Sequence, residues 1–242
     1  MKYLLDGSIE SLKARFVAKG YIQTYGVDYA ETFSPVTKNV SIIILISLAA
    51  NLGWSLFQLD VKNAFLNGDL KEELYMEKPP GFVAQGEFGK VCKLHKAIYD
   101  LKQSPRACFG KFRAAILMFG LRCCQSNCSV FCHTFERGKI LLIVYVDDII
   151  ITGDDRKGIH DLKTFLQNSF QTKDLCKLRY FLGIELARSK EGIELSQRRY
   201  VLDILEETSL LGSKPVETPM DHNVKLYEDQ GELLSNPKRY RH

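Results

Sequence analysis

Two strongly apolar, β-prone runs dominate the sequence, and only an acidic pair separates them. The runs cover residues 140–146 and 149–152, with Asp147 and Asp148 between them. Two such runs joined by so short a polar link are typical of a β-hairpin. Because both runs are apolar throughout, we expect the sheet to be covered on both faces. An acidic pair alone usually forms a solvated turn, but at the end of a packed sheet an unpaired charge is costly.

Asp60 is a candidate third carboxylate for the same end of the sheet. The segment 55–60, SLFQLD, has the apolar spacing of a short strand, and Asp60 is its last residue. A lone aspartate in that position usually only starts a turn. If this strand lies beside the hairpin, the three carboxylates form an oxygen-rich site of the kind that suits Mg²⁺. Two such ions about 4 Å apart can activate a 3′-hydroxyl and stabilise a pyrophosphate leaving group.

A second acidic pair, Asp154 and Asp155, follows the second apolar run. The sequence TGDD is similar to the GDD motif of RNA-dependent RNA polymerases. However, Arg156 and Lys157 come directly after it, and no second apolar strand follows closely. We therefore interpret this pair as a solvated loop rather than as a catalytic pair.

Strand-like and helix-like segments alternate along the chain, which indicates an α+β fold with helices on an antiparallel sheet. The clearest helix has Ser104 as its expected N-cap, Pro105 at its first position and Gly120 after its last turn. The segments that we expect are a strand at 11–20, a loop at 26–37, a helix at 40–53, strands at 55–60 and 90–95, a helix at 104–119, the hairpin, a helix at 158–170, strands at 178–187 and 192–196, a helix at 197–210 and an irregular segment at 213–242.

Composition excludes several classes of protein. The 242 residues are 45% hydrophobic and 26% charged, as in ordinary globular proteins, which argues against disorder. The net charge of +4 is too small to indicate a nucleic-acid partner by itself. No secretory signal is visible, and the longest apolar run, 42–52, is far shorter than the roughly 20 residues of a membrane span.

Four of the seven cysteines lie close together in the sequence. Without a signal peptide we expect all seven to be reduced thiols. Cys123, Cys124, Cys128 and Cys132 lack the C-x2-C spacing of zinc sites, and His133 is the only histidine nearby. We therefore interpret the four as small buried side chains rather than as metal ligands.

Several long stretches resemble one known family in content and in order. They are DGSIESLKARFVAKGY, GVDYAETFSPV, FQLDVKNAFLNGDLKEELYMEKPPGF, VCKLHKAIYDLKQSPRA, LLIVYVDDIIITGDD, LRYFLGIELARSKEGIELSQRRYVLDIL and KPVETPM. On these stretches the chain resembles the reverse transcriptase domain of copia-type LTR retrotransposons, which is encoded in their Gag-Pol polyproteins. It departs from the usual pattern at Ile43 (usually arginine), Asp100 (usually glycine) and Cys108 (usually tryptophan), and at Asn127 and Cys128.

The resemblance implies a right-hand polymerase fold, in which the palm has an antiparallel sheet that bears the YVDD hairpin. It assigns the whole chain, 1–242, to a reverse transcriptase domain. The implied parts are fingers at about 1–54 and 71–106, palm at about 55–70 and 107–196, and a partial thumb or connection at 197–242.

The resemblance also implies roles for individual residues. Asp60, Asp147 and Asp148 match the catalytic carboxylates that bind two Mg²⁺ ions, or Mn²⁺ in their place. Phe65 matches the ring that packs under the sugar of the incoming dNTP and excludes a 2′-hydroxyl. The other implied dNTP-binding residues are Gln103, Asn63, Ala64, Lys13 and Arg15. The implied primer-contacting residues are Tyr180, Phe181, Leu182 and Gly183, and Lys173 is a weaker candidate for a proton donor to pyrophosphate.

The implied partners are an RNA or DNA template with its primer and dNTP, with no membrane. RNase H and integrase regions are expected in a full-length element but lie outside this sequence. The resemblance implies an intracellular, cytoplasmic location. The alternative is a catalytically silent, truncated remnant that at most binds nucleic acid, which the departures at Ile43 and Cys108 favour. A two-metal nuclease fits less well, because it leaves Phe65 and Gln103 unexplained.

Overall fold

The computed structural model describes residues 2–3, 8–11, 15–78, 89–136 and 138–218, together with residues 223, 225 and 227. The chain divides into two compact units, Met1–Leu178 and Arg179–His242.

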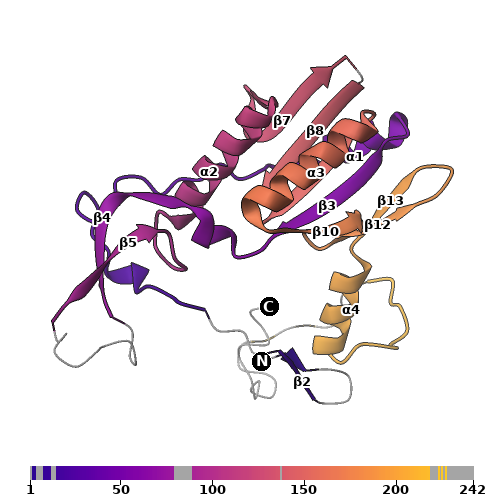
Figure 1. Cartoon of the computed structure of the whole chain (residues 1–242). Coiled ribbons are helices and arrows are strands. Elements are labelled where there is room, and N and C mark those ends of the chain that lie inside the picture. Colours follow the sequence, from indigo (N-terminus) through magenta and orange to yellow (C-terminus); the bar gives the residue numbers. More distant parts are fainter. Residues whose placement is uncertain are drawn as a thin grey trace. The chain divides into compact units, whose positions relative to one another are not determined.

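The first unit is built on a six-stranded antiparallel sheet (Figure 1). Its spatial order is β10-β3-β9-β8-β7-β6, so β3 has a neighbour on each side. The strands are β3 (Ser55–Val61), β6 (Arg122–Cys124), β7 (Asn127–Phe135), β8 (Gly138–Tyr145), β9 (Asp148–Gly153) and β10 (Thr172–Lys177). The two apolar runs of the sequence thus form the adjacent strands β8 and β9, which pair antiparallel.

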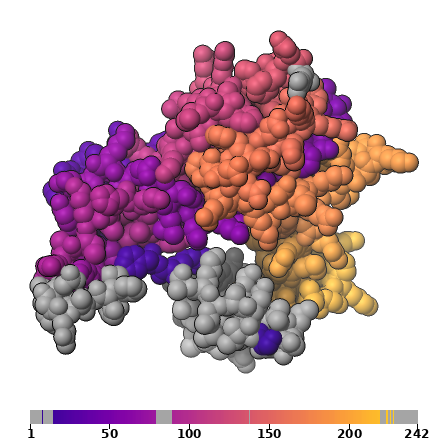
Figure 2. All heavy atoms as spheres, viewed as in Figure 1, coloured from indigo at the N-terminus to yellow at the C-terminus, as the bar shows by residue number. Residues whose placement is uncertain are grey.

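Two helices, α2 (Ser104–Phe119) and α3 (Arg156–Phe170), cover one face of this sheet (Figure 1). Phe112 of α2 contacts Phe170 of α3 with ring centroids 5.4 Å apart, and the space-filling view shows the two helices packed closely together (Figure 2). On the sheet, Leu142, Ile149 and Ile151 join the same core and are fully buried. Burial of this apolar surface is the main stabilising contribution to the unit.

The opposite face of the sheet is covered as well, as the apolar runs predict. Ile143 and Ile150 alternate with the residues of the first face and are also buried. The helix α1 (Asn39–Asn51) contacts β3, and its Ser41 hydroxyl accepts a hydrogen bond from Asn127 of β7 at 3.0 Å. Gly53, with φ of +69°, follows the helix at the predicted end.

The helix α2 has the predicted range, but its first residue does not have the predicted role. Gln103, not Ser104, occupies the N-cap position, and no side chain caps the helix there. The Ser104 hydroxyl instead donates to the carbonyl of Ile98 at 2.6 Å, so the N-cap prediction was wrong by one residue. Pro105 lies in the first turn and Gly120, with φ of +106°, ends the helix as predicted.

The 3-10 helix η2 (Ala64–Asn67) is followed along the chain by β4 (Asp69–Glu77). This strand pairs with β5 (Val91–Lys96) in a two-stranded antiparallel sheet. A further pair is β1 (Lys2–Tyr3) with β2 (Ile9–Ser11), and η1 (Gly20–Ile22) follows. The predicted strand at 11–20 was wrong over residues 15–20, because residues 15–19 contribute only an isolated bridge from Val17 to Tyr99 and Gly20 begins η1. The predicted loop at 26–37 has no helix or strand.

The second unit contains a three-stranded sheet and a helix. Its strands are β11 (Tyr180–Phe181), β12 (Ile184–Arg188) and β13 (Ile193–Ser196), and its helix is α4 (Arg198–Glu207). The strand predicted at 178–187 is interrupted by a turn at Leu182 and Gly183, which both have positive φ. Residues 213–218 form no helix or strand, and most of the rest of the predicted irregular segment lies outside the described residues.

All seven cysteines are free thiols, and the clustered four lie on the β6–β7 hairpin. The Sγ atoms of Cys124 and Cys132 are 3.6 Å apart, and burial raises the pKa of Cys124 to about 11. Cys128 is exposed and the other three are partly buried, so the expectation of buried side chains was wrong for Cys128. Among the described residues no helix has the length and apolarity that would cross a membrane.

Candidate active site

The three candidate carboxylates meet at one end of the six-stranded sheet. Asp60 of β3 lies directly opposite Asp148 of β9 in the antiparallel register. Asp147 precedes Asp148 in the turn that links β8 to β9, and its carbonyl accepts a hydrogen bond from the Val61 amide at 2.8 Å. Pairing of two strands thus brings together residues that are far apart in the sequence.

The surroundings of Asp148 disfavour its negative charge. Burial raises the pKa of this carboxyl group above its ordinary value, and the charges of Asp147 and Asp60 raise it further. A hydrogen bond from Gln58 Nε2 to Asp148 Oδ1, at 3.0 Å, opposes this shift. Asp147 is exposed, and its carboxylate has no hydrogen-bond or ion-pair partner among the described residues. Such a cluster of like charges is stabilised by a bound cation.

The three carboxylates lie at one end of the sheet, and their oxygen atoms are the type of donor that suits a hard divalent ion. Within the described part of the chain, no three His, Cys, Asp or Glu side chains form a group arranged to hold a metal. Oxygen ligands on a partly solvated sheet end are nevertheless the chemistry that Mg²⁺ prefers. Lys173 of β10 lies opposite Asp60 in the register, so a cationic side chain also belongs to this end of the sheet.

The turn that carries Asp147 has a strained backbone. Val146 has φ of +57°, a left-handed conformation that β-branched residues rarely adopt. Strain of this kind persists only where the surrounding structure imposes it. Here the two flanking strands are paired in full register, so the turn must connect them within two residues.

A small apolar cavity of about 70 Å³ lies beside this turn, and Val61, Ala64, Phe65, Cys108 and Val146 are among its lining residues. Phe65 is therefore close to the strained turn. Burial raises the pKa of the Cys108 thiol to about 11, and the charge of Asp147 adds to the effect. The Cys108 thiol therefore lies near Asp147 and resists deprotonation. The cavity beside Cys108 is consistent with a smaller side chain at a position where the sequence pattern has tryptophan.

Tyr99 connects three of the residues that the sequence assigned to dNTP binding. Its hydroxyl donates to Asn63 Oδ1 at 3.4 Å, and its ring packs edge-on against Phe65 with centroids 5.6 Å apart. The guanidinium of Arg15 lies over the same ring, 5.5 Å from its centroid. Sequence reasoning did not single out Tyr99, although it lies in the quoted stretch AIYDLKQ.

The segment after Asp60 and the turn after Tyr99 both use left-handed backbone. Asn63 has φ of +51° and precedes the buried Ala64 of η2. Asp100 has φ of +67°, which agrees with the usual glycine at that position. Lys13, the remaining basic candidate, lies outside the described residues.

The Gln103 side chain has its hydrogen-bond partners elsewhere than in the Tyr99 cluster. It is only 2% exposed and bonds to Gln23 and to the carbonyl of Asp28. The four predicted primer-contacting residues form β11 and its turn in the second unit, where Phe181 is buried and Tyr180 is exposed.

The second acidic pair lies at the other end of β9 and has different partners. Asp154 Oδ1 accepts a hydrogen bond from the Lys139 amide. Asp155 is the N-cap of α3 and accepts from the Gly158 amide at 2.8 Å. The prediction of a solvated loop was wrong for Asp155, which is buried as a helix cap. Asp154 is exposed, as that prediction required.

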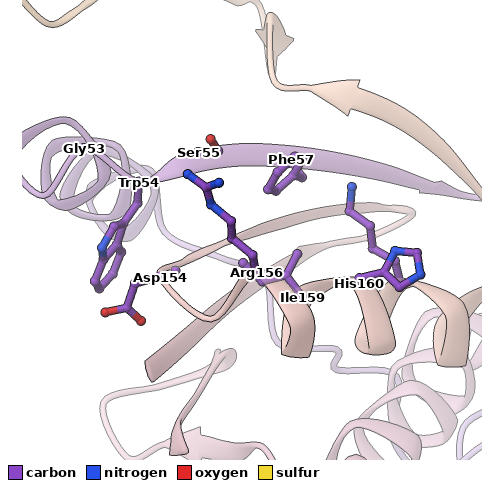
Figure 3. Close-up of a pocket in the computed structure, with 10 residues that line it drawn as sticks. Gly53, Trp54, Ser55, Phe57, Asp154, Arg156, Ile159 and His160 are labelled. Carbon is purple, nitrogen blue, oxygen red and sulfur yellow. The ribbon is translucent and has the colours of Figure 1, made fainter. Parts of the chain in front are cut away.

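A pocket of about 580 Å³ lies at the same end as the second acidic pair (Figure 3). Its lining residues, some of which are labelled in Figure 3, are Gly53, Trp54, Ser55, Phe57, Gly153, Asp154, Arg156, Ile159, His160 and Lys163. None of the candidate active-site residues is among them. This pocket is therefore separate from the three carboxylates.

Comparison with known proteins identifies the family. The family model described as "Reverse transcriptase (RNA-dependent DNA polymerase)" matches residues 6–222. The chain is 48% identical over 242 residues to the retrovirus-related Pol polyprotein from transposon RE1 of Arabidopsis thaliana, covering 99% of this chain and 16% of that protein. It is 42% identical over 224 residues to the corresponding polyprotein from transposon TNT 1-94 of Nicotiana tabacum, covering 91% of this chain and 17% of that protein.

More distant relatives include the transposon Ty1-H Gag-Pol polyprotein of Saccharomyces cerevisiae, which is 28% identical over 243 residues, with 95% of this chain and 13% of that protein covered. The chain thus spans about a sixth of the length of the plant polyproteins that it matches. The family match covers most of the chain, and the resemblance to copia-type elements is confirmed at this level. The chain belongs to the reverse transcriptase family of retrotransposon Pol polyproteins.

Proposed function

We propose that this chain is an RNA-directed DNA polymerase that adds dNTP to the 3′-hydroxyl of a primer on an RNA or DNA template. The observation that carries this proposal is the direct pairing of Asp60 with Asp148, with Asp147 in the adjoining turn. The raised pKa of Asp148 supports it, because a site that resists negative charge gains most from a bound cation.

In this proposal Asp60, Asp147 and Asp148 hold two Mg²⁺ ions, or Mn²⁺ in their place. When bound, the ions would activate the primer hydroxyl and neutralise negative charge on the leaving pyrophosphate. Asp60 and Asp147 would hold the ions most directly, and Asp148 would be less directly engaged. Lys173, opposite Asp60, is a candidate proton donor to pyrophosphate.

The dNTP is assigned to the surface that follows Asp60. Phe65, held edge-on by Tyr99, packs under the sugar and excludes a 2′-hydroxyl by sterics. The backbone N–H groups of Asn63 and Ala64 face the triphosphate. Arg15 and Lys13 neutralise phosphate charge, and Gln103 contacts the nucleotide. The β11 turn, from Tyr180 to Gly183, contacts the primer.

These roles correspond to a right-hand polymerase with fingers, palm and a partial thumb. The proposed fingers are residues 1–54 and 71–106, the proposed palm is residues 55–70 and 107–196, and the rest is a partial thumb or connection. RNase H and integrase regions of a Pol polyprotein are further proposed partners. We assign the activity to an intracellular, cytoplasmic setting by family.

Primer extension tests the proposal. The chain is incubated with poly(rA)–oligo(dT), dTTP and Mg²⁺, beside Asp147→Asn and the matched control Asp154→Asn. Both substitutions remove one charge from an aspartate next to β9, but only Asp147 is a proposed metal ligand. We expect the wild type and Asp154→Asn to extend the primer, and Asp147→Asn to lose at least about 100-fold in rate.

Two outcomes contradict the proposal. The first is a folded wild type that extends nothing, which favours a silent remnant that binds nucleic acid through phosphate contacts and loses that binding steeply with salt. The second is equal extension by the wild type and Asp147→Asn. The cavity beside Cys108 is the observation that keeps the silent remnant as the second candidate.

A further inference from the structure

Gln103 is enclosed by the loop formed by residues 23–29, although the two segments are far apart in the sequence. The Gln103 side chain is 2% exposed. Its Oε1 accepts a hydrogen bond from Gln23 Nε2 at 3.1 Å, and its Nε2 donates to the carbonyl of Asp28 at 3.0 Å. The same loop therefore contacts both ends of this amide.

The hydrogen-bond partners allow each of these two amides only one orientation. The Lys102 backbone N–H donates to Gln23 Oε1 at 2.8 Å, so that the Gln23 NH₂ group must face Gln103. A backbone N–H can only donate and a carbonyl can only accept. Reversing Gln23 would place two donors together at Lys102, and reversing Gln103 would place two acceptors together at Asp28.

Lys102 also holds the loop from the other side. Its Nζ donates to the carbonyl of Gln23 at 3.0 Å and to the Tyr29 hydroxyl at 3.3 Å, and lies 4.8 Å from the centroid of the Tyr29 ring. Within the loop, the Thr24 amide donates to Asp28 Oδ2 at 2.7 Å. The Asp28 carbonyl that orients Gln103 therefore belongs to a braced segment.

The fixed amide still has capacity for a ligand. A glutamine side chain has two N–H donors and two acceptor lone pairs, and Gln103 uses one of each inside the chain. With respect to the described residues one donor and one acceptor of Gln103 remain unused, in directions that the loop sets. A nucleotide that bonds to Gln103 therefore meets an amide whose orientation costs nothing further on binding.

We propose that Gln23 is a positioning residue for nucleotide binding, which acts by fixing the orientation of the Gln103 amide. This inference rests on the function proposed above and adds a residue that the sequence pattern did not assign. Gln23 does not touch the nucleotide. Nucleotide affinity depends on it through Gln103 alone.

Steady-state primer extension with varied dTTP tests this role in Gln23→Ala and Gln23→Glu. We expect each to raise the KM for dTTP about 5- to 10-fold and to change kcat less than about twofold. Gln23→Glu separates positioning from a structural role. Its carboxylate still accepts from the Lys102 amide and adds attraction to the Lys102 ammonium, but it cannot donate to Gln103.

A purely structural role for Gln23 therefore predicts near-normal kinetics for Gln23→Glu, and that result would overturn the inference. A double-mutant cycle gives the second criterion: Gln103→Ala with Gln23→Ala is expected to have the KM of Gln103→Ala alone. Additive effects would show that Gln23 does not act through Gln103. Gln167→Ala, an exposed glutamine on α3, is the matched control and is expected to behave as wild type.

Primer extension by the wild type distinguishes failure of the proposed function from failure of the inference about Gln23. If the folded wild type does not extend primers, the proposed function fails and this inference falls with it. If the wild type extends primers, Asp147→Asn does not, and neither Gln23 variant changes KM, the proposed function stands and only the role of Gln23 is overturned. Circular dichroism is used to check that each variant remains folded at the assay temperature.

Discussion

The two acidic pairs at the two ends of β9 have the same residue types but opposite environments. Asp154 and Asp155 each accept a backbone hydrogen bond, one from Lys139 and the other from Gly158 at the start of α3. The Asp147 carboxylate has no such partner among the described residues. Within the same part of the chain, the Asp148 carboxylate accepts a hydrogen bond only from the Gln58 side chain. Asp154 and Asp155 therefore stabilise the fold through backbone hydrogen bonds, whereas Asp147 and Asp148 keep carboxylate oxygens that could bind a ligand.

This difference shows why spacing alone does not identify a catalytic pair. A carboxylate that accepts a backbone N–H at a helix N-terminus already has its charge stabilised by that bond and by the helix dipole. It has little to gain from a cation. Asp148 is instead disfavoured as a charged group, because burial raises its pKa and the charges of Asp147 and Asp60 add to this, which makes it a candidate metal ligand.

Gly153→Ala tests the end of β9 that adjoins Asp154 and Asp155, and it has the largest expected effect on stability. A Cβ at Gly153 would lie 2.0 Å from the backbone oxygen of Lys139, and φ there is +148°. We expect a loss of about 3 kcal/mol in the free energy of unfolding, measured by urea denaturation with circular dichroism.

Gly110→Ala is the matched control for Gly153→Ala. Gly110 lies within α2, and a Cβ there would meet nothing within 4 Å. It is expected to stabilise the protein by roughly 0.5–1 kcal/mol, because alanine favours a helix. Equal effects of the two substitutions would show that the sheet end tolerates a side chain at Gly153.

Asp155→Ala removes the cap of α3 and tests whether this acidic pair is structural. The expected loss is about 1–2 kcal/mol in the free energy of unfolding, since the Gly158 amide loses its partner. Asp155→Asn keeps an acceptor oxygen and is expected to lose much less. The proposal of a structural pair would be wrong if Asp155→Ala unfolded like the wild type but no longer extended primers.

Asp148→Asn tests the opposite end of β9 through the pH dependence of stability, and it has the smallest expected effect. The pKa of Asp148 is raised in the folded state, so the unfolded chain loses this proton first as pH rises. The stability of the wild type therefore falls between the ordinary pKa of about 4 and the raised pKa, and the fall is lost in Asp148→Asn.

The expected difference at pH 7 is well below about 1 kcal/mol, because solvent screens this partly exposed group. Thermal unfolding across pH 4 to 8, without Mg²⁺, measures it. Identical pH profiles for the wild type and Asp148→Asn would contradict the destabilised environment of the carboxylates.

Much of the first unit could be predicted from local signals. Helix α2 begins near Pro105 and ends at Gly120, and the apolar runs on either side of Asp147 became adjacent strands. Strand β10 was missed because its sequence, TKDLCK, is polar and mostly exposed at the sheet edge. The cysteine-rich segment that forms β6 and β7 was considered only as a thiol cluster, and its strand character was overlooked.

The sequence names candidate residues for the site, but it does not reveal the contacts between them. The sequence pattern named Asp60, Phe65 and Gln103, yet no local signal shows that Tyr99 packs on Phe65 or that Gln23 bonds to Gln103. These contacts join segments brought together only by tertiary packing. Composition and periodicity describe one segment at a time, so they do not reveal such pairs.

The position of β3 between β9 and β10 restricts how copies of this sequence can diverge. Side chains on a strand alternate between faces, so inserting or deleting one residue before Asp60 would turn its carboxylate to the opposite face. Both neighbouring strands would resist a compensating slip. Substitutions within β3 can accumulate gradually, but the insertion or deletion of one residue would separate Asp60 from the other two candidate carboxylates in a single step.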